Sequence, residues 1–155
     1  FSWHTEEEST MNAKGIISII ASLLMLLSAS VFAAGDHQTA TAPEDFLAME
    51  NPNDPDDVDD DFLKSAGKLY KRKCKKCHGT DGDGQGSAAE DIEIKPTDFT
   101  VAGYMEERAD GQLFWIIKEG SEGTEMEAFG PGTDVNVSEE EIWNLISFMH
   151  AKFAN

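Results

Sequence analysis

The sequence predicts a small all-α domain over residues 59–155, preceded by segments that form no core of their own. Two observations support this prediction. Apolar residues recur at helical spacing in three separate segments, and long glycine-rich loops join those segments. Loops of this length normally count against a compact domain. They are expected if a group other than polypeptide fills the middle of the domain.

The charge of the chain limits its partners. The 155 residues include 30 Asp and Glu against 12 Lys and Arg, which gives a formal net charge of −18. A surface this acidic repels phosphate backbones, so we do not expect nucleic-acid binding.

The first 34 residues are expected to lie outside the domain. Residues 1–10 carry three consecutive glutamates, the wrong charge for the start of a signal peptide, so we interpret them as a non-native or read-through leader. Residues 11–34 have one lysine, an apolar run and small residues at the end, the pattern of a secretory signal peptide. The run is just long enough to span a bilayer, so an uncleaved anchor is the alternative. Either interpretation predicts an exported, periplasmic protein, soluble or tethered to the membrane.

The next segment, residues 35–58, is rich in Asp and Glu, contains three prolines and has no Lys or Arg. Such a composition buries too little apolar surface to offset the entropy lost on ordering the chain. The sequence therefore predicts an acidic, disordered tether that leads into the domain.

The first helix is predicted over residues 60–73. Aspartates at its start and Lys and Arg at its end both suit the helix dipole. One face collects the apolar side chains Phe62, Ala66, Leu69 and Tyr70. Gly67 costs about 1 kcal/mol relative to alanine inside a helix, so we expect another segment to pack closely against it.

Two further helices are predicted downstream. One covers residues 110–119, and Gly120 stands where a left-handed cap would end it. The other begins at the capping box formed by Ser138 and Glu141. Its apolar stripe consists of Ile142, Ile146, Met149 and Phe153.

The stretch CKKCHG contains Cys74 and Cys77, the only cysteines, followed directly by His78. A structural zinc site needs four ligands, and this stretch offers three at most. A redox dithiol is expected at the start of a helix after a strand, whereas this motif follows a helix. A disulfide across so short a loop stabilises little. C-x-x-C-H is instead typical of covalent c-type haem attachment, in which the two thiols reach the haem vinyl groups and the histidine binds iron.

The chain resembles the class I monohaem c-type cytochromes over residues 62–153. The resemblance lies in AGKLY, CKKCHGTDGDGQG, DGQLFWIIKEG, GTEMEAFG and the last helix with Trp143. It implies a small cytochrome c fold, with three main helices and long loops around one covalently attached haem. It also implies that the first and last helices cross at Gly67, with Trp143 or Phe148 nearby. The function implied is one-electron transfer between respiratory or other redox proteins, not enzymatic catalysis.

The resemblance also implies the remaining site residues. Met126, in a glycine-rich loop, stands where the family places its second iron ligand; His37 and His150 are weaker alternatives. Pro96 is the proline whose carbonyl would accept a hydrogen bond from Nδ1 of His78. Trp115 would contact a haem propionate or belong to the core, and Arg108 would balance a propionate or lie in solvent. If Met126 does not bind iron, the open position would suit an enzyme or a gas sensor.

Seven of the twelve Lys and Arg residues fall between Lys64 and Lys76. They would steer an acidic partner toward the CKKCHG motif. The alternative is a solvated helix face with pairs such as Asp60–Lys64. The acidic remainder of the surface would favour a basic partner instead.

Overall fold

The chain is built from helices joined by loops. The structure, a computed structural model, describes residues 39–154, and no strand occurs in that range. In chain order the elements are α2 (Glu44–Leu47), η2 (Pro55–Asp57), α3 (Asp60–Lys73), α4 (Lys75–His78), η3 (Ala89–Asp91), α5 (Tyr104–Glu107), α6 (Asp110–Glu119) and α7 (Glu139–Phe153). The all-α prediction is confirmed, and the three main helices are α3, α6 and α7.

Helix α3 has the bounds that the sequence predicts. The Asp59 side chain caps its first turn by accepting a hydrogen bond from the Phe62 N–H at 2.8 Å. Its last turn carries three basic residues beside the negative end of the helix dipole. Its buried residues are Ala66, Gly67, Leu69 and Tyr70.

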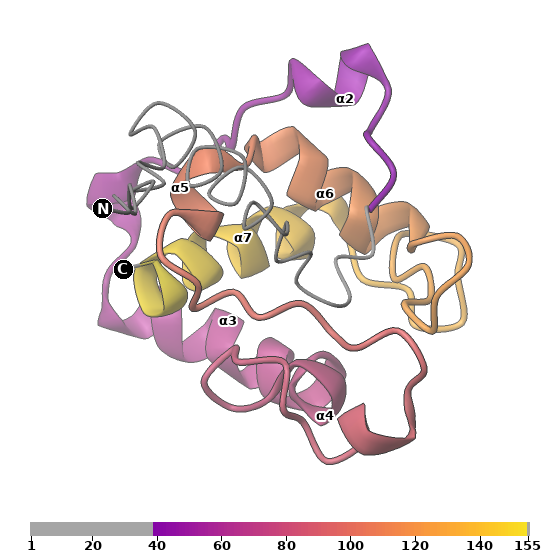
Figure 1. The fold of residues 1–155 in the computed structure, drawn as a ribbon. Coiled ribbons are helices and arrows are strands. Elements are labelled where there is room, and N and C mark those ends of the chain that lie inside the picture. The colour runs from indigo at the N-terminus through magenta and orange to yellow at the C-terminus, as the bar shows by residue number, and fades with distance from the viewer. Residues whose placement is uncertain (1–38, 155) are drawn as a thin grey trace, which may run out of the picture. The chain divides into compact units, whose positions relative to one another are not determined.

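Helix α7 is the central element, because both α3 and α6 pack against it (Figure 1). The predicted capping box starts it. Glu141 N–H donates to Ser138 Oγ at 3.2 Å, while Glu141 Oε2 accepts from the Ser138 N–H at 3.0 Å. Two free donors of the first turn are therefore satisfied by side chains.

The crossing of α3 and α7 depends on Gly67. A Cβ built there would lie 3.0 Å from the Phe148 ring, tighter than ordinary contact. The Phe148 and Tyr70 ring centroids are 5.5 Å apart. The predicted glycine–aromatic contact is thus present with Phe148. Trp143 instead stacks on Phe114 of α6, with centroids 4.3 Å apart.

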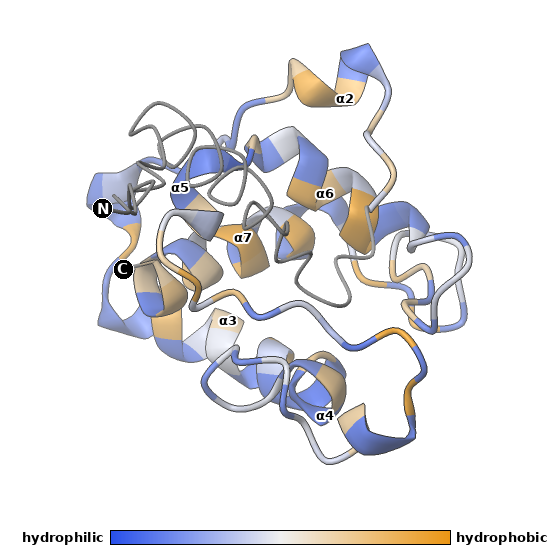
Figure 2. Cartoon of the chain, viewed as in Figure 1, coloured by the Kyte–Doolittle hydropathy of each residue, from blue (hydrophilic) through white to orange (hydrophobic). Residues whose placement is uncertain are grey.

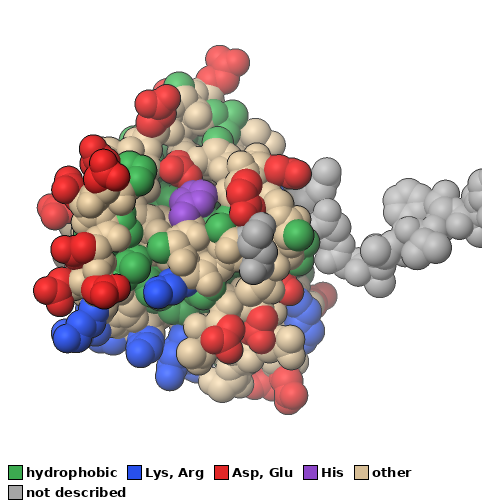
Figure 3. All heavy atoms as spheres, turned by 90° about the vertical axis from the view of Figure 1, so that its left-hand side faces the viewer, with side chains coloured by type: hydrophobic (Ala, Val, Ile, Leu, Met, Phe, Trp, Pro, Cys, Tyr) green, Lys and Arg blue, Asp and Glu red, His purple; other side chains and the backbone are tan. Residues whose placement is uncertain are grey.

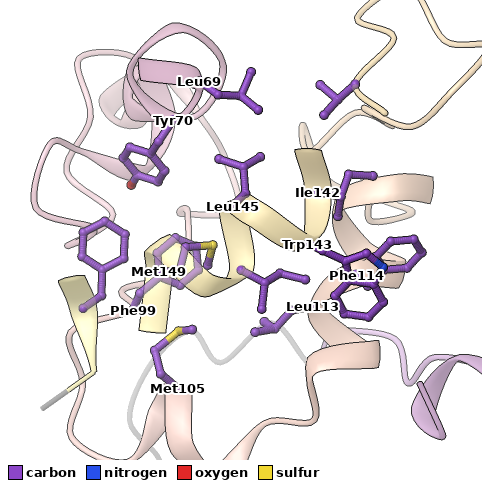
Figure 4. Close-up of a cluster of buried hydrophobic side chains, with 13 residues drawn as sticks. Leu69, Tyr70, Phe99, Met105, Leu113, Phe114, Ile142, Trp143, Leu145 and Met149 are labelled. Carbon is purple, nitrogen blue, oxygen red and sulfur yellow. The ribbon is translucent and has the colours of Figure 1, made fainter. Parts of the chain in front are cut away.

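The core lies between α7 and its neighbours. Figure 4 shows the buried side chains meeting there, including Met105 and Met149 with their sulfur atoms inside the cluster. Strongly apolar residues concentrate on α2, α6 and α7, whereas α3, α4 and the loop after α4 are mostly hydrophilic (Figure 2). Apolar burial joins α7 to α3 through Leu69 and Tyr70, and to α6 through Leu113 and Phe114.

Residues 40–53, here called the N-terminal strap, differ from the predicted tether. They pack against α6 and α7 in an ordered conformation. Phe46 stacks on Phe114 with centroids 6.3 Å apart. Gln112 Oε1 accepts from the Ala42 N–H at 2.7 Å, and Gln112 Nε2 donates to the Ala40 carbonyl at 3.0 Å. The prediction of disorder rested on the average composition of the segment, whereas these contacts depend on only a few of its residues.

The strap also satisfies Ser147, a polar residue of α7 that is 8% exposed. Its Oγ accepts from Asn51 Nδ2 and Asn53 Nδ2, each at 3.0 Å. Gln112 is the other buried polar side chain described, at 6% exposure, and its partners also belong to the strap. Among residues 39–154, the buried side chains of Gln112 on α6 and Ser147 on α7 therefore have their hydrogen-bond partners in this strap.

The predicted leader, signal segment and His37 lie outside the described residues. Within residues 39–154, no helix combines the length and the apolar character needed to cross a bilayer.

Candidate functional site

The CKKCHG motif forms a single helical turn. Helix α3 ends at Lys73, and the N–H groups of Cys77 and His78 both bond to the Cys74 carbonyl, at 3.1 and 3.0 Å. Residues three and four apart face the same side of a helix. The two thiols and the imidazole are therefore presented on one face of this turn.

The glycine-rich loop after the turn holds it in place. Gly84 N–H donates to the His78 carbonyl, Gly86 N–H to the Cys77 carbonyl and Ala88 N–H to the Lys76 carbonyl, at 2.9–3.0 Å. These are the carbonyls that a helix end leaves without partners. A Cβ on Gly86 would clash with the Lys76 carbonyl, so the loop requires glycine there.

Tyr70 joins this turn to the core. Its hydroxyl donates a 3.0 Å hydrogen bond to the Gly79 carbonyl, which directly follows His78. Burial, followed by the nearby Cys74, raises the pKa of Tyr70 above its ordinary value. The hydroxyl is therefore protonated and able to donate throughout the physiological range.

His78 is held in a defined orientation. Its ring stacks on Phe99, with centroids 4.7 Å apart and planes 21° apart. Its Nδ1 lies 3.4 Å from the Thr97 carbonyl oxygen. Burial lowers the pKa of His78, which favours the neutral ring. A neutral ring that donates from Nδ1 keeps the Nε2 lone pair for a metal.

The carbonyl at His78 is that of Thr97 and not that of Pro96, the residue that the family resemblance implies. The Pro96 carbonyl oxygen faces Gly84, where a Cβ would lie only 2.5 Å from it. The chain turns between these two residues, so the next carbonyl reaches His78. Contact between Pro96 and haem stays a prediction.

The two cysteines are free thiols. Burial, followed by the neighbouring Cys77, raises the pKa of Cys74 to about 12. A redox dithiol needs a lowered thiol pKa, so this environment argues against that interpretation. Among the described residues, no group of three or more His, Cys, Asp or Glu side chains is arranged to hold a metal.

The residues present fit a covalently attached haem. Two free cysteines and one imidazole share a face of one turn, and Phe99 stacks on the imidazole. Sequence reasoning missed Thr97 and Phe99, which follow Pro96 closely. The sequence indicated neither the hydrogen bond to Thr97 nor the stacking of Phe99, apart from placing an aromatic residue soon after Pro96.

Met126 lies in an ordered turn after α6. Its N–H donates to Thr124 Oγ1 at 3.0 Å, and its carbonyl accepts from the Ser121 N–H at 2.9 Å. Its side chain is half-buried, and no hydrogen bond joins it to His78. The loop does touch the segment that leads to Thr97, because the Glu93 N–H donates to Glu125 Oε1 at 3.3 Å. Ligation of iron by Met126 stays a prediction.

The other methionines of the domain fill the core. Met105 is fully buried, and Met149 is 5% exposed. The interpretation of Met149 as core filler is confirmed. The burial of Met105 was missed, because it belongs to a short helix with no apolar stripe.

Two of the remaining candidates, His150 and Arg108, have partners outside the CKKCHG turn. His150 Nε2 lies 2.7 Å from Asp110 Oδ1, so Asp110 already engages this alternative iron ligand. The Arg108 guanidinium lies 4.5 Å above the centre of the Tyr104 ring. Trp115 is half-buried on α6. Propionate contacts of Trp115 and Arg108 stay predictions.

Comparisons with known proteins agree with this geometry. The family model described as subunit III of cbb3-type cytochrome c oxidase matches residues 62–149. No curated protein matches the chain. Among solved structures, a chain of a reducing HAO-like protein complex from Kuenenia stuttgartiensis is similar, with 25% identity and a TM-score of 0.54. The match covers 70% of this chain and 49% of that chain, so this chain spans about half the length of that relative.

Proposed function

Since the chain belongs to the family of cbb3-type cytochrome c oxidase subunit III, we propose that it carries single electrons between redox proteins through one covalently attached haem c. We further propose that it does so after export, either as a soluble protein or tethered to a membrane. The family supports a role in electron transfer. The number of haems, the His/Met ligation and the identity of the partners belong to the proposal.

The observation that carries the proposal is the hydrogen bond between His78 Nδ1 and the Thr97 carbonyl, beside two free thiols. This bond fixes the tautomer of the ring and directs Nε2 toward a ligand. A histidine buried only to fill space would not need two free cysteines on the same turn. The combination suits an iron porphyrin anchored on one edge.

The chain's own residues would hold the group as follows. Cys74 and Cys77 would each add an S–H across a vinyl double bond, which forms one S–C and one C–H bond and needs no oxidant. His78 would bind the iron through its imidazole nitrogen, and Met126 would bind it through its sulfur. Haem c, when bound, supplies the redox chemistry, because its iron gains and loses one electron. A thioether ligand favours Fe(II) and raises the reduction potential.

The residues that surround His78 would limit movement at the site. Phe99 stacks on the His78 ring and keeps its plane fixed. Gly84 and Gly86 tie the turn to the loop behind it. A rigid ligand set keeps the geometry similar in both oxidation states, which an electron carrier needs.

The test is to produce the full chain alongside a haem-attachment apparatus and to add carbon monoxide to the reduced protein. We expect haem that survives denaturation and is lost in the Cys74→Ala/Cys77→Ala double variant. We also expect a visible spectrum that carbon monoxide does not change. Colourless protein would overturn the haem assignment. Prompt carbon monoxide binding would overturn His/Met ligation and favour the enzyme or gas-sensor alternative.

A further inference from the structure

The segment between η3 and Phe99 has no backbone ladder to hold it. Among the described residues, no backbone–backbone hydrogen bond involves residues 93–98. The contact between the Pro96 carbonyl and Gly84 is steric, because glycine permits the close approach without adding an attraction. Yet this segment carries Thr97, whose carbonyl lies at Nδ1 of His78. Its course therefore depends on side-chain interactions.

Lys95 supplies most of these interactions. Its Nζ donates to the carbonyl oxygens of Ala89, Glu90 and Ile92, at 2.8, 3.2 and 2.9 Å. An ammonium has three N–H donors, so three acceptors match its full capacity. The acceptors lie on and just after η3, where a helix end leaves carbonyls short of partners. Because the donor is charged, each bond is stronger than one between neutral groups.

Lys95 binds backbone rather than a carboxylate. Carboxylates are abundant in this acidic chain, and Figure 3 shows them spread over one face, with Lys and Arg gathered mainly along its lower part. The two ion pairs found in residues 39–154 involve Lys118 and His150, not Lys95. The pair between Asp60 and Lys64, an alternative that the sequence offered, is also absent from that range. A lysine that only adds surface charge would extend into solvent or meet a carboxylate.

Helix η3 is itself attached to the CKKCHG turn. The Ala88 N–H donates to a carbonyl of that turn at 2.9 Å, and Ala89 is buried. Lys95 is thus joined through η3 to the turn that carries His78. Its three bonds close a ring of contacts that leaves the turn at Ala88 and returns to the His78 ring through Thr97.

The other side of Thr97 is fixed by the backbone. The Phe99 N–H donates to the Gly82 carbonyl at 2.8 Å. Thr97 therefore lies between this bond and Lys95. Loss of the Lys95 bonds would free only the side that precedes Thr97, so its carbonyl would move away from His78 while Phe99 kept its place.

One further hydrogen bond reaches this segment. The Glu93 N–H donates to Glu125 Oε1 at 3.3 Å, and both residues are exposed. This is a single long bond for which water competes, so it holds the segment less firmly than the three bonds of Lys95 do.

We propose that Lys95 is a positioning residue of the haem site, which holds the Thr97 carbonyl at Nδ1 of His78 by binding the carbonyls at the end of η3. The inference rests on the proposed function, because it concerns the histidine that we expect to bind iron. An acceptor at Nδ1 makes the imidazole a better donor and stabilises Fe(III), which lowers the reduction potential. The positive charge of Lys95 acts in the opposite direction, because a nearby cation destabilises Fe(III).

A potentiometric titration of the haem-loaded full chain separates these two effects by their sign. Lys95→Met removes the charge and all three donors, and we expect it to raise the reduction potential. Lys71→Met is the charge control, because it removes an exposed lysine from α3 and should lower the potential or leave it unchanged. Lys95→Arg keeps the charge and several donors, so its potential should lie closer to that of the unmodified protein. A potential that Lys95→Met lowers or leaves unchanged would overturn the proposal.

Hydrogen exchange gives a second readout, independent of the potential. In the reduced protein, NMR follows the Nδ1–H of His78 and the backbone amides of α7. Lys95→Met should speed exchange of the Nδ1–H about tenfold and leave the α7 amides unchanged, because only the segment beside His78 opens. Equal acceleration of both would mean a general loss of stability and would overturn the positioning role. If Lys95→Met does not fold, Lys95→Gln, which lacks the charge but keeps an amide donor, takes its place with the same expected signs.

Failure of the proposed function would give a different result. An unmodified chain that attaches no haem, or whose haem does not exchange electrons with hexacyanoferrate(III), would overturn the electron-carrier function and this inference with it. Normal haem attachment and electron exchange, with Lys95→Met matching Lys71→Met in both readouts, would overturn only the role of Lys95.

Discussion

The carbonyl oxygen of Thr97 lies 3.4 Å from Nδ1 of His78, although 19 positions separate the two residues. The loop between them carries no long helix, so its course depends on close backbone contacts at glycines. The hydrogen bond to His78 therefore depends on the contact that positions the Pro96–Thr97 segment. That contact is the approach of the Pro96 carbonyl to Gly84.

Gly84→Ala should raise the reduction potential of the haem-loaded protein. The new Cβ would lie 2.5 Å from the Pro96 carbonyl oxygen and push the segment away from His78. A histidine that loses its Nδ1 acceptor is a weaker donor and stabilises Fe(III) less. A potentiometric titration measures the change. Gly132→Ala is the control, because Gly132 also has positive φ but has no atom within 4 Å of its Cβ position. Equal potentials in the two variants would contradict the role of Thr97.

Gly111→Ala should release the N-terminal strap. Replacing glycine by alanine inside a helix usually stabilises it by about 1 kcal/mol. Here the added Cβ would clash with the Phe46 carbonyl, so we expect Gly111→Ala to destabilise the folded protein. The measurement is the melting temperature, together with proteolytic cleavage within residues 40–53.

Ser147→Ala gives a second test of the strap without any clash. It removes the acceptor of Asn51 and Asn53 and should cost about 1–3 kcal/mol in the free energy of unfolding. A strap that stays protease-resistant in both variants would show that these contacts do not hold it.

The pair formed by His150 and Asp110 should make stability depend on pH. The hydrogen bond that His150 donates to Asp110, opposed in part by burial, raises the pKa of His150 above its ordinary value. The folded state therefore binds this proton more tightly than the unfolded state. The stabilisation is complete below about pH 6.5, the unfolded pKa, and is lost as pH rises through the folded pKa.

Denaturant unfolding of the haem-loaded protein between pH 5 and pH 9 checks this sign, with an expected amplitude of about 1 kcal/mol or less for so accessible a pair. His150→Gln should remove the part of the slope of unfolding free energy against pH that His150 contributes. Glu106 adds to the rise in the pKa of His150. Glu106→Gln should therefore narrow the pH range over which this stabilisation is lost, without abolishing the effect. A slope unchanged in His150→Gln would contradict the assignment.

Met126→Ala should open the iron to carbon monoxide, because it removes the sulfur that we expect as the second axial ligand. The visible spectrum of the reduced protein after gas addition is the measurement. Met149→Leu is the matched control, since Met149 fills the core and a similar apolar side chain replaces it at little cost. If Met126→Ala excludes carbon monoxide as the control does, Met126 is not the second iron ligand.

The sequence by itself determined the features that are local in the chain. The bounds of α3 follow from Asp59 at its start and the basic residues at its end. The start of α7 follows from Ser138 and Glu141, three residues apart. The C-x-x-C-H spacing indicated haem attachment because one helical turn brings both thiols and the imidazole to the same face. Each of these depends on interactions across only a few residues.

Only the tertiary structure decided which distant segments meet. It placed Thr97 rather than Pro96 at His78, and it turned residues 40–53 from a predicted tether into a packed strap. Composition averages over a segment, so it could not show that Phe46 stacks on Phe114. It also could not show that Gln112 and Ser147 are buried polar residues that bond to this segment. Such pairings depend on the shape of surfaces that exist only after the helices have packed. The spacing of residues along the chain does not depend on that shape. The sequence could therefore predict haem attachment, whereas the residues that contact His78 could be identified only from the fold.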